Sequence, residues 1–454
     1  SMKEMDDGRF NKVANIIGQS MQYHPHGDAS IGDALVNLGQ KDLLIDTQGN
    51  WGDVRTGDQA AASRYIEARL SKFALEVAFN AKTTIWQLSY DGRKNEPVTL
   101  PMKFPLLLAQ GADGIAVGLS TKILPHNFCE LIDASIKYLK GKKFELFPDF
   151  QTGGMVDVSG YNEGKRGGKV RVRAHIEELD KKTLIIKDVP YSVTTTQLME
   201  SITKANDQGK IKIKKVTDVT AAAVEIHIDL APGISPDITI DALYAFTDCE
   251  VSLSPNACVV INHKPHFIGV QELLKDATDN TKELLRRELD IRLSELEDKW
   301  HYTSLEKIFF EEKIYKELEQ KHASWENVIE AIDKAFTPFK KKLKRAIERE
   351  DILKLTEKPV RRIYRLDINE LIEQIRGIEE EIKQVKFDLE HLTEYSVAYF
   401  ENLLKKFGKN KDRKTEIKAF DTIQVKQVAI ANTKLYINRA EGFIGTSLKK
   451  DEHL

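Results

Sequence analysis

The sequence is poor in cysteine and has no long apolar run. Its 454 residues include three cysteines, Cys129, Cys249 and Cys258, and none of them forms a Cys-x-x-Cys pair. Neither a zinc site nor a disulfide framework is therefore indicated, and a reducing cytoplasm is the expected location. Because no stretch approaches the roughly 18 apolar residues of a membrane span, no membrane partner is expected.

An excess of charge of either sign is also missing. The chain has 68 Lys and Arg against 70 Asp and Glu, a formal net charge of -2. Bulk charge gives no support to nucleic-acid binding, so a DNA-binding surface would need basic residues segregated onto one face. A Walker A motif and an acidic cluster with two-metal spacing are absent from the sequence as well, so ATP and metal binding are not expected of this chain itself.

The first hundred residues are typical of short helices separated by polar turns. Asp28 is expected to cap a helix that carries Ile31 and Leu35 on one face. A second amphipathic helix is predicted directly after Tyr65, because Ile66 and Leu70 begin a further helical spacing.

From about 150 to 262 the apolar period changes to two, which predicts half-buried strands. In the clearest case Val170 and Val172 alternate with Lys169, Arg171 and Arg173. A solvated basic strand face is more often a defence against edge pairing. The functional alternative is a surface that contacts phosphates.

Beyond residue 268 the pattern becomes that of long helices. A leucine-rich stripe is followed by a heptad seam, which predicts an antiparallel helical hairpin with a small helical globule at its far end. The segment 409–414 is expected to be a charged linker before the first strands of a further β domain. The apolar positions of the two helical runs are Leu285, Leu289, Leu293, Leu296 and Trp300, then Leu371, Ile375, Ile378, Ile382, Val385, Leu389 and Leu392.

Several short motifs stand in one order and spacing. With them the chain resembles, over about residues 7 to 408, the A subunit of bacterial type IIA DNA topoisomerases. A chance match over that length is very improbable, whereas an isolated Arg-Tyr pair would be read as a surface arginine beside a packed aromatic. The motifs are Tyr23-His24-Pro25-His26-Gly27-Asp28, Asp46 to Gly52, Gly57 to Tyr65, Glu67 to Leu70, Gly114-Ile115-Ala116-Val117-Gly118 and Pro125-His126-Asn127.

The resemblance implies that Tyr65 is the nucleophile that attacks a DNA phosphate. Tyrosine alone is a poor nucleophile, with a pKa of about 10, and it needs a base or nearby cations. The adjacent Arg64 suits a phosphate because its guanidinium is planar and always charged. By resemblance, His24 and His26 assist the tyrosine. A metal pair of these histidines is not expected, since no third ligand is evident.

The resemblance also implies a set of DNA-binding residues. Asp28 would open the recognition helix, and Ile115 would wedge between base pairs at a cost offset by contacts to bent DNA. Ala29 departs from the pattern, because many members carry Ser there in the quinolone-contact region, and Asp33 matches an acidic partner position. The expected DNA-binding residues are Asp28, Ala29, Asp33, Ile115, Arg69, Lys169, Arg171 and Arg173.

The fold class expected from the resemblance is α+β and multidomain. Mg²⁺ and ATP would both be bound by the B subunit, in a heterotetramer of two A and two B chains on double-stranded DNA, with the A chains forming a homodimer. A cytoplasmic, nucleoid-associated location follows. The expected domains are 1–117, an N-terminally truncated winged-helix cleavage domain; 118–262, a mixed α/β tower; 263–312 with 366–408, a long antiparallel coiled coil; 313–365, a helical dimerisation gate; and 409–454, a linker and the start of a C-terminal β domain.

The function implied is transient double-strand breakage through a tyrosine–5′-phosphate linkage. With the B subunit this would serve ATP-dependent strand passage, decatenation and relaxation. The segment after Ile423 resembles topoisomerase IV more than gyrase, whose A subunit is the alternative. A non-catalytic coiled-coil DNA-binding scaffold is a third reading, which explains the heptads but not the surroundings of Tyr65.

Overall fold

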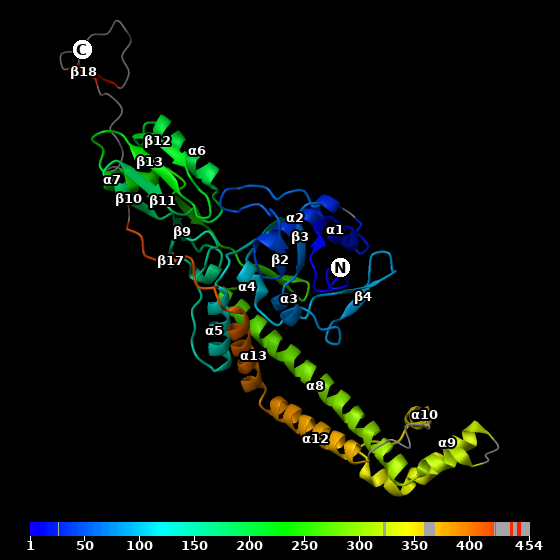
Figure 1. Cartoon of the computed structure of the whole chain (residues 1–454). Helices are drawn as coiled ribbons and strands as arrows, with labels where there is room; N and C mark the ends of the chain where they lie inside the picture. Colours follow the sequence, from blue (N-terminus) through cyan, green and yellow to red (C-terminus); the bar gives the residue numbers. More distant parts are fainter. Residues whose placement is uncertain are drawn as a thin grey trace. The chain divides into compact units, whose positions relative to one another are not determined.

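A computed structural model of the chain describes residues 1–25, 27–320, 324–357, 368–421, 423, 436–438 and 443–445. Within them the fold is mixed α+β, with several small sheets and long helices, so the expected α+β class is confirmed (Figure 1). No described helix is both long and apolar enough to cross a membrane. The chain divides into two compact units: unit 1 is Ser1–Phe79, Thr84–Asp279 and Phe400–Leu454, and unit 2 is Asn80–Thr83 and Asn280–Tyr399.

The N-terminal part of unit 1 packs two helices on a three-stranded sheet. Helices α1 (Val13–Met21) and α2 (Asp28–Gln40) accompany strands β1 (Asn11–Lys12), β2 (Ile45–Gln48) and β3 (Glu67–Leu70), in the order β1-β3-β2. The predicted cap is wrong in detail, because Gly27 is the N-cap of α2, with φ 73°, and Asp28 lies in the first turn. A carboxylate in that turn still favours the helix through the helix dipole.

The helix predicted to follow Tyr65 directly is wrong. The structure has strand β3 there, and helix α3 (Lys72–Val77) begins only after the Ser71 cap. The reason is a period of two at the start of the segment: Ile66 and Ala68 are both buried, and β3 pairs with β1 and β2 on its two edges. Pairing across the sheet therefore overrides the helical spacing of the apolar residues.

Two hairpins follow in unit 1. Strands β4 (Trp86–Leu88) and β5 (Asn95–Pro97) form the first, and β6 (Ala112–Ala116) and β7 (Leu119–Ile123) form the second. Helix α4 (Leu106–Gln110) lies between them in sequence, and α5 (Phe128–Leu139) comes next. The domain boundary expected at 117/118 falls in the turn of the second hairpin, between paired strands, so it does not separate structural units.

The middle of the chain builds two four-stranded sheets in unit 1. One has the order β10-β11-β13-β12, and α6 (Thr195–Asp207) and α7 (Pro236–Phe246) contribute apolar residues to the core that it shares. The other has the order β14-β9-β8-β17. Their strands are β8 (Met155–Asp157), β9 (Val170–Arg173), β10 (Ile176–Asp180), β11 (Thr183–Ile186), β12 (Ile213–Asp218), β13 (Ile226–Leu230), β14 (Glu250–Leu253) and β17 (Glu416–Ile417), and a separate hairpin joins β15 (Cys258–Ile261) to β16 (Lys264–Phe267).

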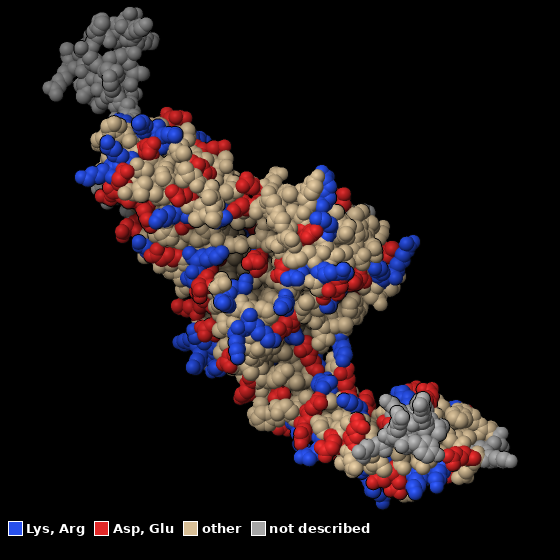
Figure 2. Space-filling model, in the orientation of Figure 1, with Lys and Arg blue, Asp and Glu red and all other residues tan. Residues whose placement is uncertain are grey.

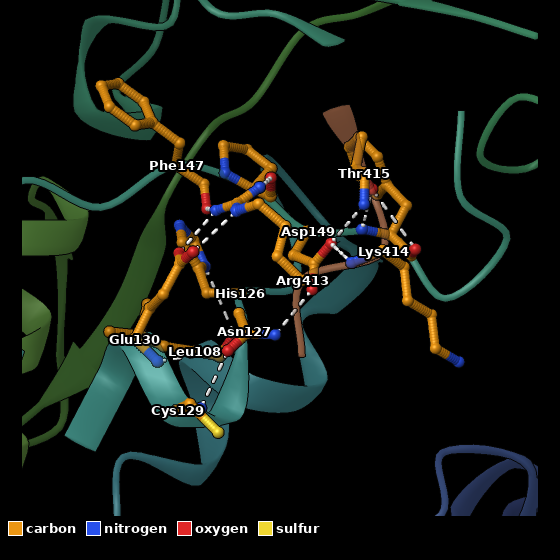
Figure 3. Close-up of polar contacts among 12 residues, drawn as sticks. Leu108, His126, Asn127, Cys129, Glu130, Phe147, Asp149, Arg413, Lys414 and Thr415 are labelled. Atoms are coloured by element: carbon orange, nitrogen blue, oxygen red, sulfur yellow. Dashed lines mark hydrogen bonds and ion pairs between the residues drawn. The ribbon is translucent and has the colours of Figure 1, made fainter. Parts of the chain in front are cut away.

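Residues 408–420, which we call the C-terminal strap, pack into unit 1 and do not form the expected linker. Strand β17 pairs in parallel with β8. The Arg413 guanidinium donates to both carboxylate oxygens of Glu130 at 2.7 and 2.5 Å and to the carbonyl oxygens of Phe147 and Pro148 (Figure 3). The charged run is therefore ordered because a bidentate ion pair and backbone acceptors satisfy its arginine.

In unit 2 the predicted antiparallel helix pairing is confirmed. Helix α8 spans Val270–Glu311 and α12 spans Ile368–Glu390, and α13 (Leu392–Phe407) follows. The Trp300 indole donates to Glu379, while Arg292 pairs with Glu381 further along the helices. A buried seam joins the two helices through Leu289, Leu296, Trp300, Ile378, Ile382 and Val385.

The helical globule expected between the two long helices is present in unit 2. Helix α9 (Trp325–Phe336) and helix α10 (Arg349–Thr356) share an apolar core with the end of α8, including Phe309, Ile332 and Ile352. The expected boundary at 365/366 lies outside the described residues.

Candidate functional site

Asp28, the last residue of the histidine motif, and residues 58–63 of the Gly57–Tyr65 motif line one groove. Its volume is about 590 Å³, and it lies between α2 and the loop that leads to Tyr65. Asp28, Ala29 and Asp33 line it from the helix, and Ala61 and Ser63 line it from the loop. All three helix residues are exposed, so the groove presents two carboxylates beside a methyl group.

The turn before Tyr65 is fixed by backbone hydrogen bonds. The amide of Tyr65 donates to the carbonyl of Ala62 at 2.8 Å, and the amide of Ala14 donates to the carbonyl of Ser63 at 3.1 Å. The next residue, Ile66, is buried, and this anchors the turn from below. Tyr65 itself lies in the turn and is 63% exposed.

Arg64 lies against the tyrosine that it precedes. Its guanidinium carbon is 4.7 Å from the centroid of the Tyr65 ring, within the range of a cation–π contact. A cation therefore accompanies an exposed phenol, which is the pairing that nucleophilic attack on a phosphate requires.

The histidine motif starts at the end of α1. His24 is exposed, and its amide donates to the Ser20 carbonyl at 3.1 Å. His26 lies outside the described residues. The structure adds a neighbour that the sequence did not indicate: the Tyr23 hydroxyl donates to Glu4, and burial together with this carboxylate raises the pKa of Tyr23 to about 12. Tyr23 is therefore protonated at neutral pH.

Arg69 is bound within the fold. It lies on strand β3, and its guanidinium donates to the Asp46 carboxylate at 3.0 Å and to the Gly8 carbonyl at 3.1 Å. It also stacks on the Phe10 ring at 4.5 Å. The helix predicted directly after Tyr65 would place Arg69 about one helical turn beyond the tyrosine, but Arg69 lies on an extended strand instead.

Ile115 lies near the turn of the β6–β7 hairpin. It is 91% exposed, and Val117 beside it is fully exposed, while Gly118 takes φ 77° in the turn. A hairpin with two bare aliphatic side chains at its tip is unusual on a protein surface that faces only water. The glycine-containing segment therefore forms an exposed hairpin and turn rather than a buried strand.

The basic strand face expected at β9 is not solvated. Arg173 is buried, donates to Glu250 at 2.5 Å and stacks on Tyr244 and Phe420. Arg171 donates to the Asp157 carboxylate at 2.5 Å. Carboxylates and aromatic rings of the same unit therefore occupy these guanidinium groups, and we do not assign Arg171 or Arg173 to phosphate contacts.

Lys169 remains exposed at the start of β9. It follows the exposed Lys165 and Arg166 in the loop between β8 and β9. Figure 2 shows basic and acidic side chains intermixed on the face that it draws, so no single large basic patch appears there. Within the described part of the chain, no three His, Cys, Asp or Glu side chains come together to hold a metal ion.

Comparison with known proteins points to one family. A family model described as the A subunit of DNA gyrase and topoisomerase IV matches residues 1–403. The A subunit of DNA topoisomerase 4 from Borreliella burgdorferi is 41% identical over 454 residues, all of this chain and 72% of that protein. The DNA gyrase A subunit of Lawsonia intracellularis is 34% identical over 314 residues, 64% of this chain and 38% of the relative. The gyrase A subunit of Staphylococcus aureus is 34% identical over 320 residues, 65% of this chain and 36% of the relative.

Proposed function

The chain belongs to the family formed by the A subunits of DNA gyrase and topoisomerase IV, and we propose that within it the chain serves a topoisomerase IV. Members of this family are the breakage-reunion subunits of type IIA DNA topoisomerases, which use Mg²⁺ and ATP. The observation that carries the assignment is the 41% identity to a topoisomerase IV relative along all 454 residues, against 34% over about two thirds of the chain for the gyrase relatives.

Tyr65 is the nucleophile in this proposal. Its phenol oxygen forms a bond to a backbone phosphorus and gives up its proton, and the bond from that phosphorus to the 3′ oxygen breaks. The freed 3′ oxygen takes a proton and becomes a hydroxyl, while the 5′ phosphate stays on Tyr65. One phosphoester replaces another, so the reverse step reseals the strand without an energy source. The exposure of Tyr65 supports this role, since a duplex must reach the phenol oxygen.

Arg64 and the histidine motif assist this step. The guanidinium of Arg64, already against the Tyr65 ring, stabilises the developing phenolate and the charge on the phosphate. His24, exposed in the same motif, supplies a second hydrogen-bonding group for the phosphate. We assign His26 the same role from its place in the motif, although it lies outside the described residues.

In this proposal the DNA lies along the groove between α2 and the loop that leads to Tyr65, and over the β6–β7 hairpin. We propose that α1, α2 and the β1-β3-β2 sheet form a winged-helix unit in which α2 enters the major groove with Asp28, Ala29 and Asp33. Ile115 inserts between base pairs from its exposed hairpin, and Lys169 contacts backbone phosphates. The two four-stranded sheets form the tower, α8 with α12 the coiled coil, and α9 with α10 the core of the dimerisation gate.

The remaining parts of the enzyme come from other chains. We propose a homodimer of A subunits, so that two copies of Tyr65 cut opposite strands, bound to two B subunits that hold Mg²⁺ and ATP. Mg²⁺ when bound supplies charge neutralisation at the phosphate.

Reconstitution with the cognate B subunit tests the choice within the family. With ATP and Mg²⁺, topoisomerase IV is expected to decatenate linked circles and relax supercoiled plasmid, without introducing negative supercoils. ATP-dependent negative supercoiling of relaxed plasmid would instead place the chain in a gyrase. Absence of any covalent protein–DNA complex would favour the non-catalytic scaffold.

A further inference from the structure

The loop that leads to Tyr65 is folded back on itself. The amide of Ala61 donates to the carbonyl of Asn50 at 2.9 Å, and the amide of Asp53 donates to the carbonyl of Asp58 at 3.1 Å. The residues from Asp53 to Asp58, which we call the loop tip, are therefore joined to the rest of the loop by two cross-links. A displacement of the loop tip also displaces the loop residues that line the groove.

Arg55 lies in the loop tip, where Asp53 holds it. The Arg55 amide donates to the Asp53 carboxylate at 2.7 Å. The guanidinium donates to both oxygens of the same carboxylate, through Nε at 3.0 Å and through Nη2 at 2.6 Å. A bidentate pair fixes the plane of the guanidinium, and it leaves the third nitrogen, Nη1, available for another acceptor.

That acceptor lies in a distant part of the sequence but in the same compact unit. Nη1 of Arg55 donates to the carbonyl of Ala222, in the loop between β12 and β13, at 3.0 Å. The carbonyl of Arg55 accepts from the amide of Thr195 at 2.8 Å. Thr195 is the first residue of α6, so its amide is one of the helix donors that have no partner within the helix. Arg55 therefore attaches the loop tip at two points.

The loop tip also packs closely against the start of α6. Gly57 has φ 83°, and a side-chain carbon at this position would lie 3.0 Å from a methyl group of Thr194, the N-cap of the helix. Thr195 beside it is buried. The two hydrogen bonds of Arg55 are thus supported by direct contact of the backbone with the helix terminus.

A second turn with the Asp-x-Arg pattern shows that the pattern alone does not attach a loop. In Asp91-Gly92-Arg93 the Arg93 amide donates to the Asp91 carboxylate at 3.1 Å, and the guanidinium lies 3.5 Å from the same group. The Arg93 side chain is nevertheless 86% exposed. The pattern makes a local turn, whereas Arg55 also bonds to a distant part of the fold.

We propose that Arg55 is a positioning residue for strand cleavage, which fixes the loop that presents Tyr65 by attaching the loop tip to α6 and to the β12–β13 loop. This inference rests on the proposed role of Tyr65 as the nucleophile. Arg55 acts through the loop and not on the phosphate. Because attack requires the phenol oxygen to be aligned with the phosphorus, a displacement of about 1 Å can lower the rate about 100-fold.

The test measures the single-turnover rate of covalent-complex formation by the chain with its cognate B subunit, Mg²⁺ and saturating duplex DNA. Arg55→Met, which removes the donors, is expected to lower this rate at least tenfold while the Kd for DNA stays within about twofold. A merely structural defect would lower the amount of active protein and not the rate of the active fraction. Arg55→Lys keeps the charge and one bond, so it should restore the rate to within about threefold of wild type.

Thr195→Pro breaks the attachment from the other side and leaves Arg55 unchanged. Proline has no amide hydrogen to donate to the Arg55 carbonyl, yet it suits the first position of a helix. The same fall in the cleavage rate is expected. Thr195→Val is its matched control, because it keeps the amide and loses only the hydroxyl. Arg93→Met is the control for Arg55→Met, and both controls should cleave at the wild-type rate.

A wild-type cleavage rate in either Arg55→Met or Thr195→Pro would overturn the positioning role and leave Tyr65 as the nucleophile. An equal fall in a test variant and its control would overturn it too, because the effect would not come from the attachment. If wild type forms no covalent complex, the proposed function itself fails, and the role of Arg55 fails with it.

Discussion

At the scale of single residues, exposure separates the side chains that can meet DNA from those that hold the fold. Tyr65 and Ile115 project into solvent, whereas Arg173 and His126 are almost wholly buried. The sequence alone does not show which of these side chains are exposed and which are buried. Their surroundings give them different roles, which substitution can distinguish.

Arg173 and Lys169 make a matched pair of cations on one strand segment. Removing Arg173 leaves Glu250 without its closest cation in a partly buried site, so Arg173→Met is expected to lower the free energy of unfolding by roughly 3 kcal/mol. Lys169→Ala should change it by less than about 0.5 kcal/mol. Lys169→Ala should instead reduce the salt dependence of DNA binding, with a log–log slope smaller by about one.

Denaturant unfolding and DNA-binding titrations over a range of salt concentrations measure both effects. Similar stability for the two variants would contradict the structural role given to Arg173. An unchanged salt slope in Lys169→Ala would contradict the phosphate contact.

His126 predicts a pH dependence of stability. Burial lowers its pKa to about 4 from an unfolded value of about 6.5, so the folded state holds this imidazole neutral. Below pH ~6.5 the unfolded chain takes up a proton that the folded chain refuses, and stability falls as the pH drops towards 4. The full loss is roughly 3 kcal/mol. Unfolding midpoints of wild type and His126→Gln between these pH values measure it, and parallel curves would contradict the account.

At the scale of elements, a substitution in the β6–β7 hairpin should affect DNA bending without affecting the stability of the fold. Ile115→Ala removes a side chain that is 91% exposed, so the free energy of unfolding should change by less than about 0.5 kcal/mol. Bending and cleavage of bound DNA should nevertheless fall, because the wedge between base pairs is shortened. Fluorescence energy transfer across a labelled duplex measures the bend.

Ile238→Ala is the control for this variant, since Ile238 is also an exposed isoleucine but lies on helix α7. It should leave both stability and bending unchanged. Equal bending by Ile115→Ala and wild type would show that Ile115 is not the wedge.

The elements also show where reading the sequence succeeds and where it fails. The heptad seam predicted the pairing of α8 with α12, because a repeat over three heptads reports one buried stripe directly. The prediction of a helix after Tyr65 was wrong. Ile66 and Leu70 fit a helical spacing, but Ile66 and Ala68 are both buried, which is the two-residue period of a strand. The prediction of a charged linker at 409–414 failed for a different reason. A run of lysines with one arginine is typical of a solvated segment, and the sequence does not show that the distant Glu130 pairs with Arg413.

At the scale of the whole molecule, the two compact units divide the tasks expected of the family. Unit 1 holds Tyr65 and Ile115, and unit 2 holds the paired helices and the small helical globule. The family resemblance identified the candidate nucleophile, because the motif order survives over hundreds of residues. Composition alone did not, since the near-neutral charge hides any local DNA surface.

The covalent bond between Tyr65 and DNA can be identified chemically. The chain, its cognate B subunit, Mg²⁺ and plasmid DNA are mixed, covalent complexes are trapped with denaturant, and the DNA-linked peptide is identified by mass spectrometry. If Tyr65 is the nucleophile, the peptide that contains Arg64 and Tyr65 carries a 5′-phosphate, and Tyr65→Phe gives no complex. A linkage at another residue, or covalent complexes from Tyr65→Phe at the wild-type level, would contradict it.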